Sequence, residues 1–122
     1  MFSWRRPDYL GVKDGRLARP KSTPNCVSSQ ADPADREHYI EPIKADFARV
    51  RQAVEAMPGA TVIEARVDYL YAEFRSKLLG FVDDVEFLRG EGVIHVRSAS
   101  RLGRRDFGVN RNRVEALRKL LS

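Results

Sequence analysis

Two adjacent carboxylates, Asp83 and Asp84, lie in a stretch whose other residues alternate like a buried strand. A pair of carboxylates can act as general acid and base, or it can bind a hard cation such as Mg²⁺ or Ca²⁺. Adjacent residues of a strand, however, point to opposite faces of the sheet, so Asp83 and Asp84 cannot chelate one ion together. The sequence therefore predicts separate surroundings for the two carboxylates.

One cysteine, Cys26, and two histidines far apart in the sequence are the other reactive side chains. A single cysteine excludes an intrachain disulfide, and none of the usual Cys/His zinc spacings occurs. Catalysis by Cys26 would need a nearby base, for which His38 is the local candidate, but a buried or solvent-facing thiol is the favoured interpretation. His95 falls within a predicted strand, where a packed histidine is commoner than a metal ligand. We expect no metal and no cofactor.

The chain has 122 residues, which is enough for one domain with a modest core, and a formal net charge of +5. This charge permits contact with nucleic acid, an anionic membrane surface or an acidic partner, although acidic residues are interleaved with the basic ones. No apolar run approaches the roughly 20 residues that span a bilayer, and the N-terminus lacks the apolar segment of a signal peptide. We expect a soluble, cytoplasmic protein.

The elements that must position these residues follow an extended N-terminal arm, predicted over residues 1–36 from its proline and glycine content. A helix is predicted from Ile40 to Met57, where apolar residues recur at intervals of three and four and Pro42 suits the first turn. Alternating residues predict four strands, over 61–67, 69–76, 81–88 and 93–101. Asn110 or Asn112 can cap a final helix.

This order of elements, with short turns between the strands, predicts an α+β fold. We expect an antiparallel sheet of three to five strands with two helices packed on one face. The predicted organisation is an arm over residues 1–36 and a single α+β domain over residues 37–122.

Polar residues gather where three of the predicted strands share one edge of the sheet. Alternation assigns one set to the helix-covered face: Ser76, Asp83, Ser98 and Ser100. It assigns a second set to the opposite face: Glu73, Arg75, Asp84, Glu86, Arg97 and Arg101. The second set balances three carboxylates against three guanidinium groups, which predicts ion pairs across the strands. The first set either satisfies backbone groups of the following loop, with Asp83 accepting from loop amides, or lines a pocket for a polar ligand.

Several segments in one order resemble the DUF1499 family, which is named for its unknown function. They are LGVKDGRLARP at 10–20, TPNCVSSQ at 23–30, EFRSKLLGFVDDVEF at 73–87 and IHVRSASRLGRRDFGVNRNRVEALR at 94–118. The resemblance covers nearly the whole chain but implies no mechanism. Many relatives are exported or plastid-located, and relatives often have a second cysteine about where this chain has Pro20, which would pair with the cysteine that matches Cys26.

The resemblance also marks a set of shared positions, which we take as structural or site motif residues. They are Asn25, Cys26, Ser28, Arg75, Asp84, Arg97, Asp106, Asn110 and Arg111. The candidate ligand-binding residues are Ser76, Asp83, Ser98, Ser100 and Arg101. No catalytic residue is assigned.

Three hypotheses for function remain open. The preferred one is a non-catalytic module that binds a small or amphipathic ligand, or a partner. The second is an enzyme that uses the same polar rim, with Asp83 as acid or base. The third is an adaptor that binds an anionic surface or nucleic acid through the basic C-terminal region. Nucleic acid is less favoured because Phe107 is the only stacking aromatic there. A pocket above roughly 300 Å³ beside Asp83 would favour the first two hypotheses, and a solid core with exposed Phe2 and Trp4 would favour the adaptor.

Overall fold

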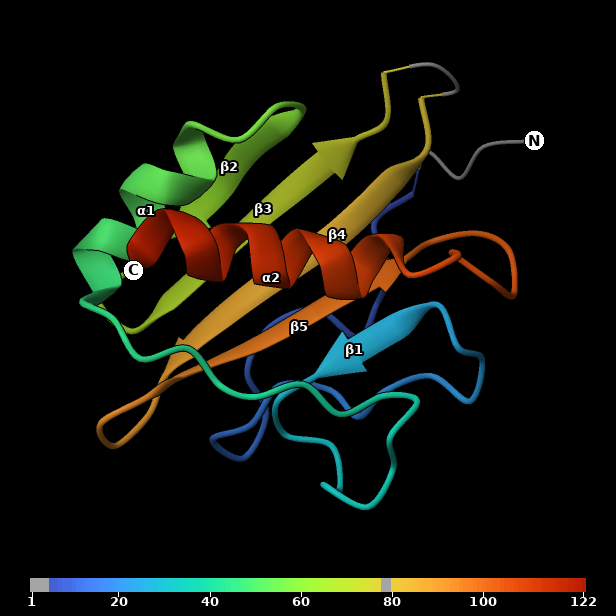
Figure 1. Ribbon diagram of the computed structural model, residues 1–122, viewed down its shortest axis with the longest axis horizontal. Coiled ribbons are helices and arrows are strands. Elements are labelled where there is room, and N and C mark those ends of the chain that lie inside the picture. Colours follow the sequence, from blue (N-terminus) through green and yellow to red (C-terminus); the bar gives the residue numbers. More distant parts are fainter. Residues whose placement is uncertain (1–4, 78–79) are drawn as a thin grey trace.

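The computed structural model describes residues 5–77 and 80–122, so Phe2 and Trp4 lie outside the described residues (Figure 1). The described part contains a five-stranded antiparallel sheet and two helices, which confirms the α+β prediction. The strands are β1 (Cys26–Ser28), β2 (Ala60–Ala65), β3 (Tyr69–Arg75), β4 (Val82–Arg89) and β5 (Ile94–Ser100). The helices are α1 (Phe47–Glu55) and α2 (Val109–Leu121). None of the helices in these residues is both long and apolar enough to cross a bilayer.

The sheet has the strand order β1-β5-β4-β3-β2, and its three central strands form a simple meander. In this register Asp83 lies opposite Ser100, and Asp84 lies opposite both Glu73 and Ala99. The outer strand β2 carries a bulge between Val62 and Glu64. The end of β3, the start of β4 and the end of β5 therefore meet at one edge, as the alternation predicted.

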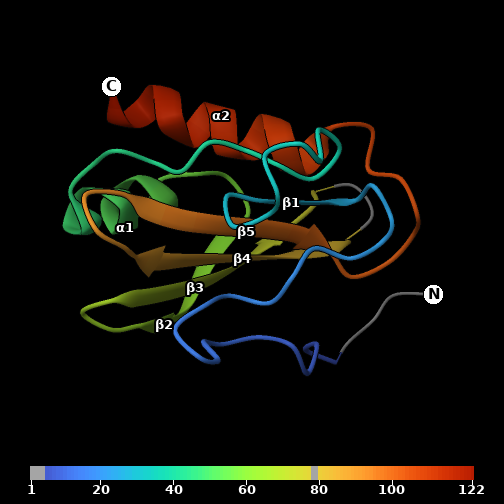
Figure 2. The same cartoon turned by 90° about the horizontal axis from the view of Figure 1, so that it is seen from below.

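Both helices cover one face of the sheet, and residues 5–21, called the N-terminal segment below, cover the other (Figure 2). Beneath the helices, Val50 of α1 and Leu117 of α2 belong to the same buried cluster as Leu70, Val85 and Val96 of the strands. These strand positions alternate with polar ones, so one face of each central strand enters the main core. The core thus fixes which face the helices occupy.

The opposite face of the sheet is not exposed to solvent, because the N-terminal segment packs on it. Leu17 is buried against a small cluster that contains Tyr69, Tyr71 and Leu88, and Leu10 packs against it. Residues 26–28 of the predicted arm also form β1, which pairs with β5. The predicted arm is therefore a second covering layer plus an edge strand.

The first helix begins later than its apolar spacing predicts. Residues 40–46 are not helical, and Ile43 exchanges two backbone hydrogen bonds with Ile94, of 2.9 and 2.7 Å. Ile40 and Ile43 are buried in the main core by this extended segment, which also contains Pro42. The prediction of a helix from Ile40 was wrong because pairing with the end of the sheet satisfies the same apolar pattern.

The second helix is also capped differently from the prediction. Gly108 is its N-cap residue, with a positive φ of 82° that suits glycine. Asp106 accepts hydrogen bonds from the backbone N–H groups of Gly108 and Asn110, at 3.0 and 2.9 Å. Neither Asn110 nor Asn112 is the cap, since both lie within the helix, and Asn110 is fully buried in its first turn.

Candidate functional site

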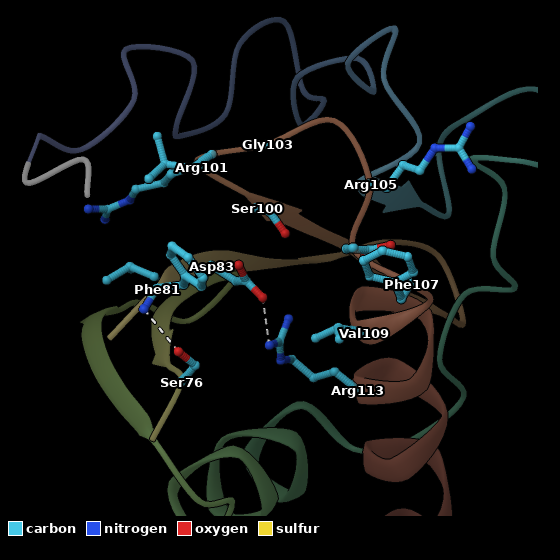
Figure 3. A pocket seen from close by; sticks show the side chains of 13 residues that line it. Ser76, Phe81, Asp83, Ser100, Arg101, Gly103, Arg105, Phe107, Val109 and Arg113 are labelled. Atoms are coloured by element: carbon cyan, nitrogen blue, oxygen red, sulfur yellow. Dashed lines mark hydrogen bonds and ion pairs between the residues drawn. The ribbon is translucent and has the colours of Figure 1, made fainter. Parts of the chain in front are cut away.

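A cavity of about 350 Å³ opens at the polar edge of the sheet, on the helix-covered face (Figure 3). The start of β4, the loop at 101–108 and the first turn of α2 enclose it. Its walls are largely apolar and are made by Phe81, Val82, Leu102, Phe107 and Val109. Asp83, Arg113, Ser76 and Ser100 also line it. The space therefore combines apolar walls with a few polar groups, as ligand pockets usually do.

Asp83 lies at the cavity as half of an ion pair. Its Oδ2 accepts a hydrogen bond from Nη2 of Arg113 at 2.7 Å, a contact drawn in Figure 3. The other terminal nitrogen of Arg113 donates to the Ser98 hydroxyl at 3.1 Å, and its guanidinium lies over the Phe74 ring at 4.7 Å. These contacts fix the position of the pair between β4 and α2.

Sequence reasoning missed Arg113 as the partner of Asp83 and placed it only within the basic C-terminal region. The available signal was its spacing from Asn110, since residues three apart lie on one face of a helix. Of the two alternatives for Asp83, which pairs with Arg113, acceptance from loop amides finds no hydrogen bond in its support among the described residues. Asp106 has that role, and although burial alone would raise its pKa, the hydrogen bonds from Asn110 and Gly108 lower it.

Two of the predicted serines border the cavity, and both already make hydrogen bonds. The Ser76 hydroxyl accepts from the Phe81 N–H at 2.9 Å, and the Ser100 hydroxyl accepts from the Asn110 side-chain amide at 2.9 Å. Ser98 is fully buried behind them and donates to Oδ1 of Asn110 at 2.6 Å. Ser98 is not part of the cavity lining.

Arg101 contributes to the cavity wall, but its guanidinium points away from it (Figure 3). On the opposite face it binds Asp84 through Nε and Nη2, at 2.9 and 2.8 Å, and Glu73 through Nη2, at 2.7 Å. The hydrogen bond with Asp84 raises the pKa of Arg101. The guanidinium is therefore held by two carboxylates outside the cavity, and a ligand-binding role for Arg101 remains a prediction.

Asp84 is the centre of a closed polar network beneath the N-terminal segment. Besides Arg101, it accepts a hydrogen bond from the Tyr71 hydroxyl at 2.5 Å, and its side chain is 0% exposed. Burial, together with this hydrogen bond, raises the pKa of Tyr71. Arg6 of the covering segment adds a 2.7 Å contact to Glu73. Of the predicted ion pairs on this face, those of Arg101 with Asp84 and Glu73 are present, and the N-terminal segment covers them.

Glu86 and Arg97, two further members of this set, form no ion pair with each other within the described residues, although they are direct neighbours across β4 and β5. Glu86 instead accepts from the Tyr69 hydroxyl at 2.5 Å and from the Gly11 N–H at 2.7 Å, and burial raises its pKa. Arg97 donates to the Arg19 carbonyl at 3.1 Å and lies over the Tyr9 ring at 4.3 Å. The covering segment thus supplies partners that the strands alone could not.

Two asparagines connect the sheet, the loop and α2. The side-chain amide of Asn25 donates to the carbonyls of Leu102 and Gly103, at 3.3 and 2.7 Å. Its backbone carbonyl accepts from the Ser100 N–H and from the side chain of Asn110. Both asparagines are 0% exposed, so their role in this structure is to hold the loop that forms one wall of the cavity.

The other motif residues also make local structural contacts. Ser28 accepts from the Gln30 N–H at 3.1 Å, Arg75 donates to the Gly80 carbonyl at 3.2 Å, and Arg111 donates to the carbonyls of Arg36 and Glu37. The Cys26 thiol is buried, and burial raises its pKa.

His38, the suggested base for Cys26, is bound to Asp35 and to the Thr23 carbonyl, at 2.7 and 2.9 Å. Across residues 5–77 and 80–122, no group of three or more His, Cys, Asp or Glu side chains is placed to hold a metal ion. The geometry therefore directs attention to the cavity beside Asp83.

Comparison of the sequence with known proteins and protein families identifies the family of this chain. No curated protein and no solved structure matches the chain. A family model described as "Protein of unknown function (DUF1499)" matches residues 16–121, a span that includes all five strands and both helices. The match covers the cavity residues as well as Asp84, Tyr71, Glu73 and Arg101 of the buried network, whereas Arg6 precedes it. The chain belongs to the DUF1499 family.

Proposed function

We propose that this protein binds a small amphipathic ligand in the cavity beside Asp83. The observation that carries the proposal is the cavity itself, with a volume of about 350 Å³ and walls made largely of apolar side chains. Pockets for small molecules usually measure about 300–1,000 Å³ and contain few polar groups, which fix the orientation of the ligand. The cavity meets both conditions.

The position of the polar groups indicates how such a ligand would lie. Its apolar part would contact Phe81, Leu102 and Val109, and burial of that surface would supply most of the affinity. Its polar end would face Asp83 and Arg113. Because the bond to Arg113 uses Oδ2 of Asp83, Oδ1 can accept a hydrogen bond from a hydroxyl or amide group of the ligand.

Binding is favoured over catalysis because Asp83 and Cys26, the candidate reactive groups, are paired or buried. Asp83 is paired with a guanidinium, whereas a carboxyl that acts as a general acid near neutral pH is usually kept apart from positive charge. The Cys26 thiol is buried, and the suggested base His38 is engaged elsewhere. These observations support a cavity that holds a molecule without transforming it.

The test is native mass spectrometry of the protein after mild purification, beside a fluorescence titration with 8-anilinonaphthalene-1-sulfonate. Val109→Trp would place a large side chain at the cavity, whereas Leu120→Trp makes a matched change at another exposed apolar position of α2. We expect a bound mass or saturable dye binding in the wild type and in Leu120→Trp, and a loss of at least tenfold in affinity in Val109→Trp. An apo mass with no saturable dye binding, or equal binding in both variants, would contradict the proposal.

A further inference from the structure

Four large apolar side chains around the mouth of the cavity are exposed to solvent. Phe81, Leu102, Phe107 and Val109 all line the cavity, and each is also substantially exposed. They come from two segments that are distant in the sequence. Phe81 directly precedes β4, and the other three lie between the end of β5 and the first residue of α2; Figure 3 shows Phe81, Phe107 and Val109 around the cavity. An exposed apolar patch of this kind marks a surface for interaction.

Phe107 is the extreme case, with 91% of its surface exposed. Its φ of 54° lies in the left-handed region, which is uncommon for a residue other than glycine. On either side, Asp106 and Gly108 are fixed by the hydrogen bonds that cap α2. The loop therefore holds an aromatic ring outward at a conformational cost, without any gain from burial in the protein.

The charged side chains exposed around this patch have one sign. Within the described residues of 75–82 and 101–109, the exposed ones are Arg75, Lys77, Arg104 and Arg105. The one acidic residue of these segments, Asp106, is engaged inward at the start of α2, and Asp83, which follows directly after Val82, is paired with Arg113. On the far side of Phe107, Arg36 and Arg111 outnumber Glu37 around a neighbouring hollow. We name the four apolar and four basic residues the rim surface.

We infer that the rim surface docks on an anionic lipid bilayer. Apolar side chains that enter the boundary between headgroups and acyl chains, surrounded by Lys and Arg, are the features of a surface that lies on a membrane. Leu102 and Val109 have no planar ring, so half of the apolar set suits acyl chains better than stacked bases. The inference stands independently of the ligand proposal, although a cavity that opens at such a surface could be filled directly from the bilayer.

Co-sedimentation tests the electrostatic part. The probes are vesicles of phosphatidylcholine with about a quarter phosphatidylserine, and vesicles of phosphatidylcholine alone. We expect binding to the first kind, weakened by salt, and little binding to the second. Arg104→Glu with Arg105→Glu should lower the partition coefficient at least tenfold, because each basic residue near such a surface contributes about fivefold. Lys13→Glu with Lys44→Glu is the control, since both lysines are exposed outside the rim surface and the net charge changes equally.

A fluorescent label tests the orientation. Phe107→Cys and Val67→Cys each add an exposed cysteine, while Cys26 is buried and should not react with a nitrobenzoxadiazole reagent. Val67 is 81% exposed and lies in the turn before β3, at the end of that strand remote from Arg75. We expect a severalfold rise in fluorescence on adding anionic vesicles for the label at 107 and no change at 67.

Three outcomes would overturn the inference. The first is equal loss of binding in the rim and control charge reversals, and the second is an equal fluorescence response at both labels. The third is binding to a single-stranded oligonucleotide with no binding to vesicles, which would assign the basic rim to nucleic acid. Melting temperatures of all variants would show that each is folded. Loss of vesicle binding in Arg75→Glu with Lys77→Glu, two residues that do not line the cavity, with dye binding retained, would separate this inference from the ligand proposal.

Discussion

Asp83 and Asp84 are neighbours in β4, yet their surroundings differ in kind. Asp84 is enclosed by Tyr71 and Arg101 beneath the N-terminal segment, and its side chain has no exposed surface. Asp83 borders a cavity that opens to solvent, and its side chain is 11% exposed with Arg113 as its partner. The same residue type thus serves a closed network on one face of the sheet and an open rim on the other.

The difference comes from what covers each face. Irregular chain carries many unpaired backbone groups, so the N-terminal segment can bind charged groups of the strands, as Gly11 does for Oε2 of Glu86 and Arg19 does for Nη2 of Arg97. Among the described residues, the other carboxylate oxygen of Glu86 and the other two nitrogens of Arg97 are buried without a hydrogen-bond partner. Helices have few free backbone groups along their length. Where α2 begins, side chains and loop leave space beside the polar edge, and that space is the candidate site.

The largest effect that separates the two faces is expected from Asp84→Asn. Removing the buried negative charge takes one of two carboxylates that bind Arg101 out of the covered network, while Glu73 stays bound. Loss of one partner from a buried ion pair typically costs about 3–5 kcal/mol of unfolding free energy. Urea denaturation would measure the change.

Asp83→Asn is the matched substitution one residue earlier. Water in the cavity can hydrate Arg113 after the change, so we expect a loss of only about 1 kcal/mol. Binding of the anionic anilinonaphthalene dye should tighten in this variant, because the Arg113 guanidinium loses its carboxylate partner, and should not change in Asp84→Asn. Equal destabilisation by both substitutions would show that the two faces do not differ in the way described.

Acid should act on the two faces with opposite sign. The pKa of Asp106 is lowered in the folded protein from its ordinary value of 3.8, so its stabilising contribution is present above that pH and is lost as the pH falls below it. The pKa of Glu86 is raised from 4.5, so the neutral form is favoured and its contribution declines as the pH rises above that value. Substituting one residue at a time separates the contribution of Asp106 to the pH dependence of stability from that of Glu86.

Unfolding free energies between pH 3 and 7 would check this. Asp106→Asn should cost roughly 1 kcal/mol near neutral pH, as expected for a helix cap, and less at pH 3. Glu86→Gln should gain stability relative to the wild type as the pH rises. A constant difference between wild type and variant across this range, for either residue, would contradict its assigned role.

The smallest effect on stability is expected at the rim surface. Phe107→Gly removes a side chain that is almost wholly exposed and relieves a positive φ, so unfolding free energy should stay constant or rise by up to about 1 kcal/mol. Binding to anionic vesicles should nevertheless fall. Thermal denaturation and co-sedimentation of the same preparation would measure both, and a clear loss of stability would mean that Phe107 supports the loop.

Much of the fold could be predicted because the strands alternate so regularly. The four predicted strands appear as β2 to β5 with ends shifted by one or two residues, and alternation assigned Asp83 and Asp84 to the correct faces. The start of α1 could not be predicted in this way. Ile40 and Ile43 fit a helical stripe, but they are buried just as well by an extended segment that pairs with Ile94.

The candidate site was predictable only in part. The meander brings Ser76, Asp83 and Ser100 to one edge, and strand spacing is enough to show this. The partner of Asp83 is on α2, and the direction of a helix across a sheet depends on packing that no local pattern states. The burial of Asp84 beneath the N-terminal segment could not be predicted for a similar reason, since contacts such as that of Arg97 with the Arg19 carbonyl join residues distant in the sequence.

The pairing of β1 with β5 also affects the order in which the protein can assemble during synthesis. Residues 26–28 must wait for residues 97–99 before they can join the sheet, and Asn25 must wait for Leu102 and Gly103. At translation rates of about 5–20 residues per second, this delay lasts roughly 4–15 seconds. Residues 25–28 therefore leave the ribosome before the other four strands and yet are among the last to dock, and until then the buried charges of the sheet remain hydrated.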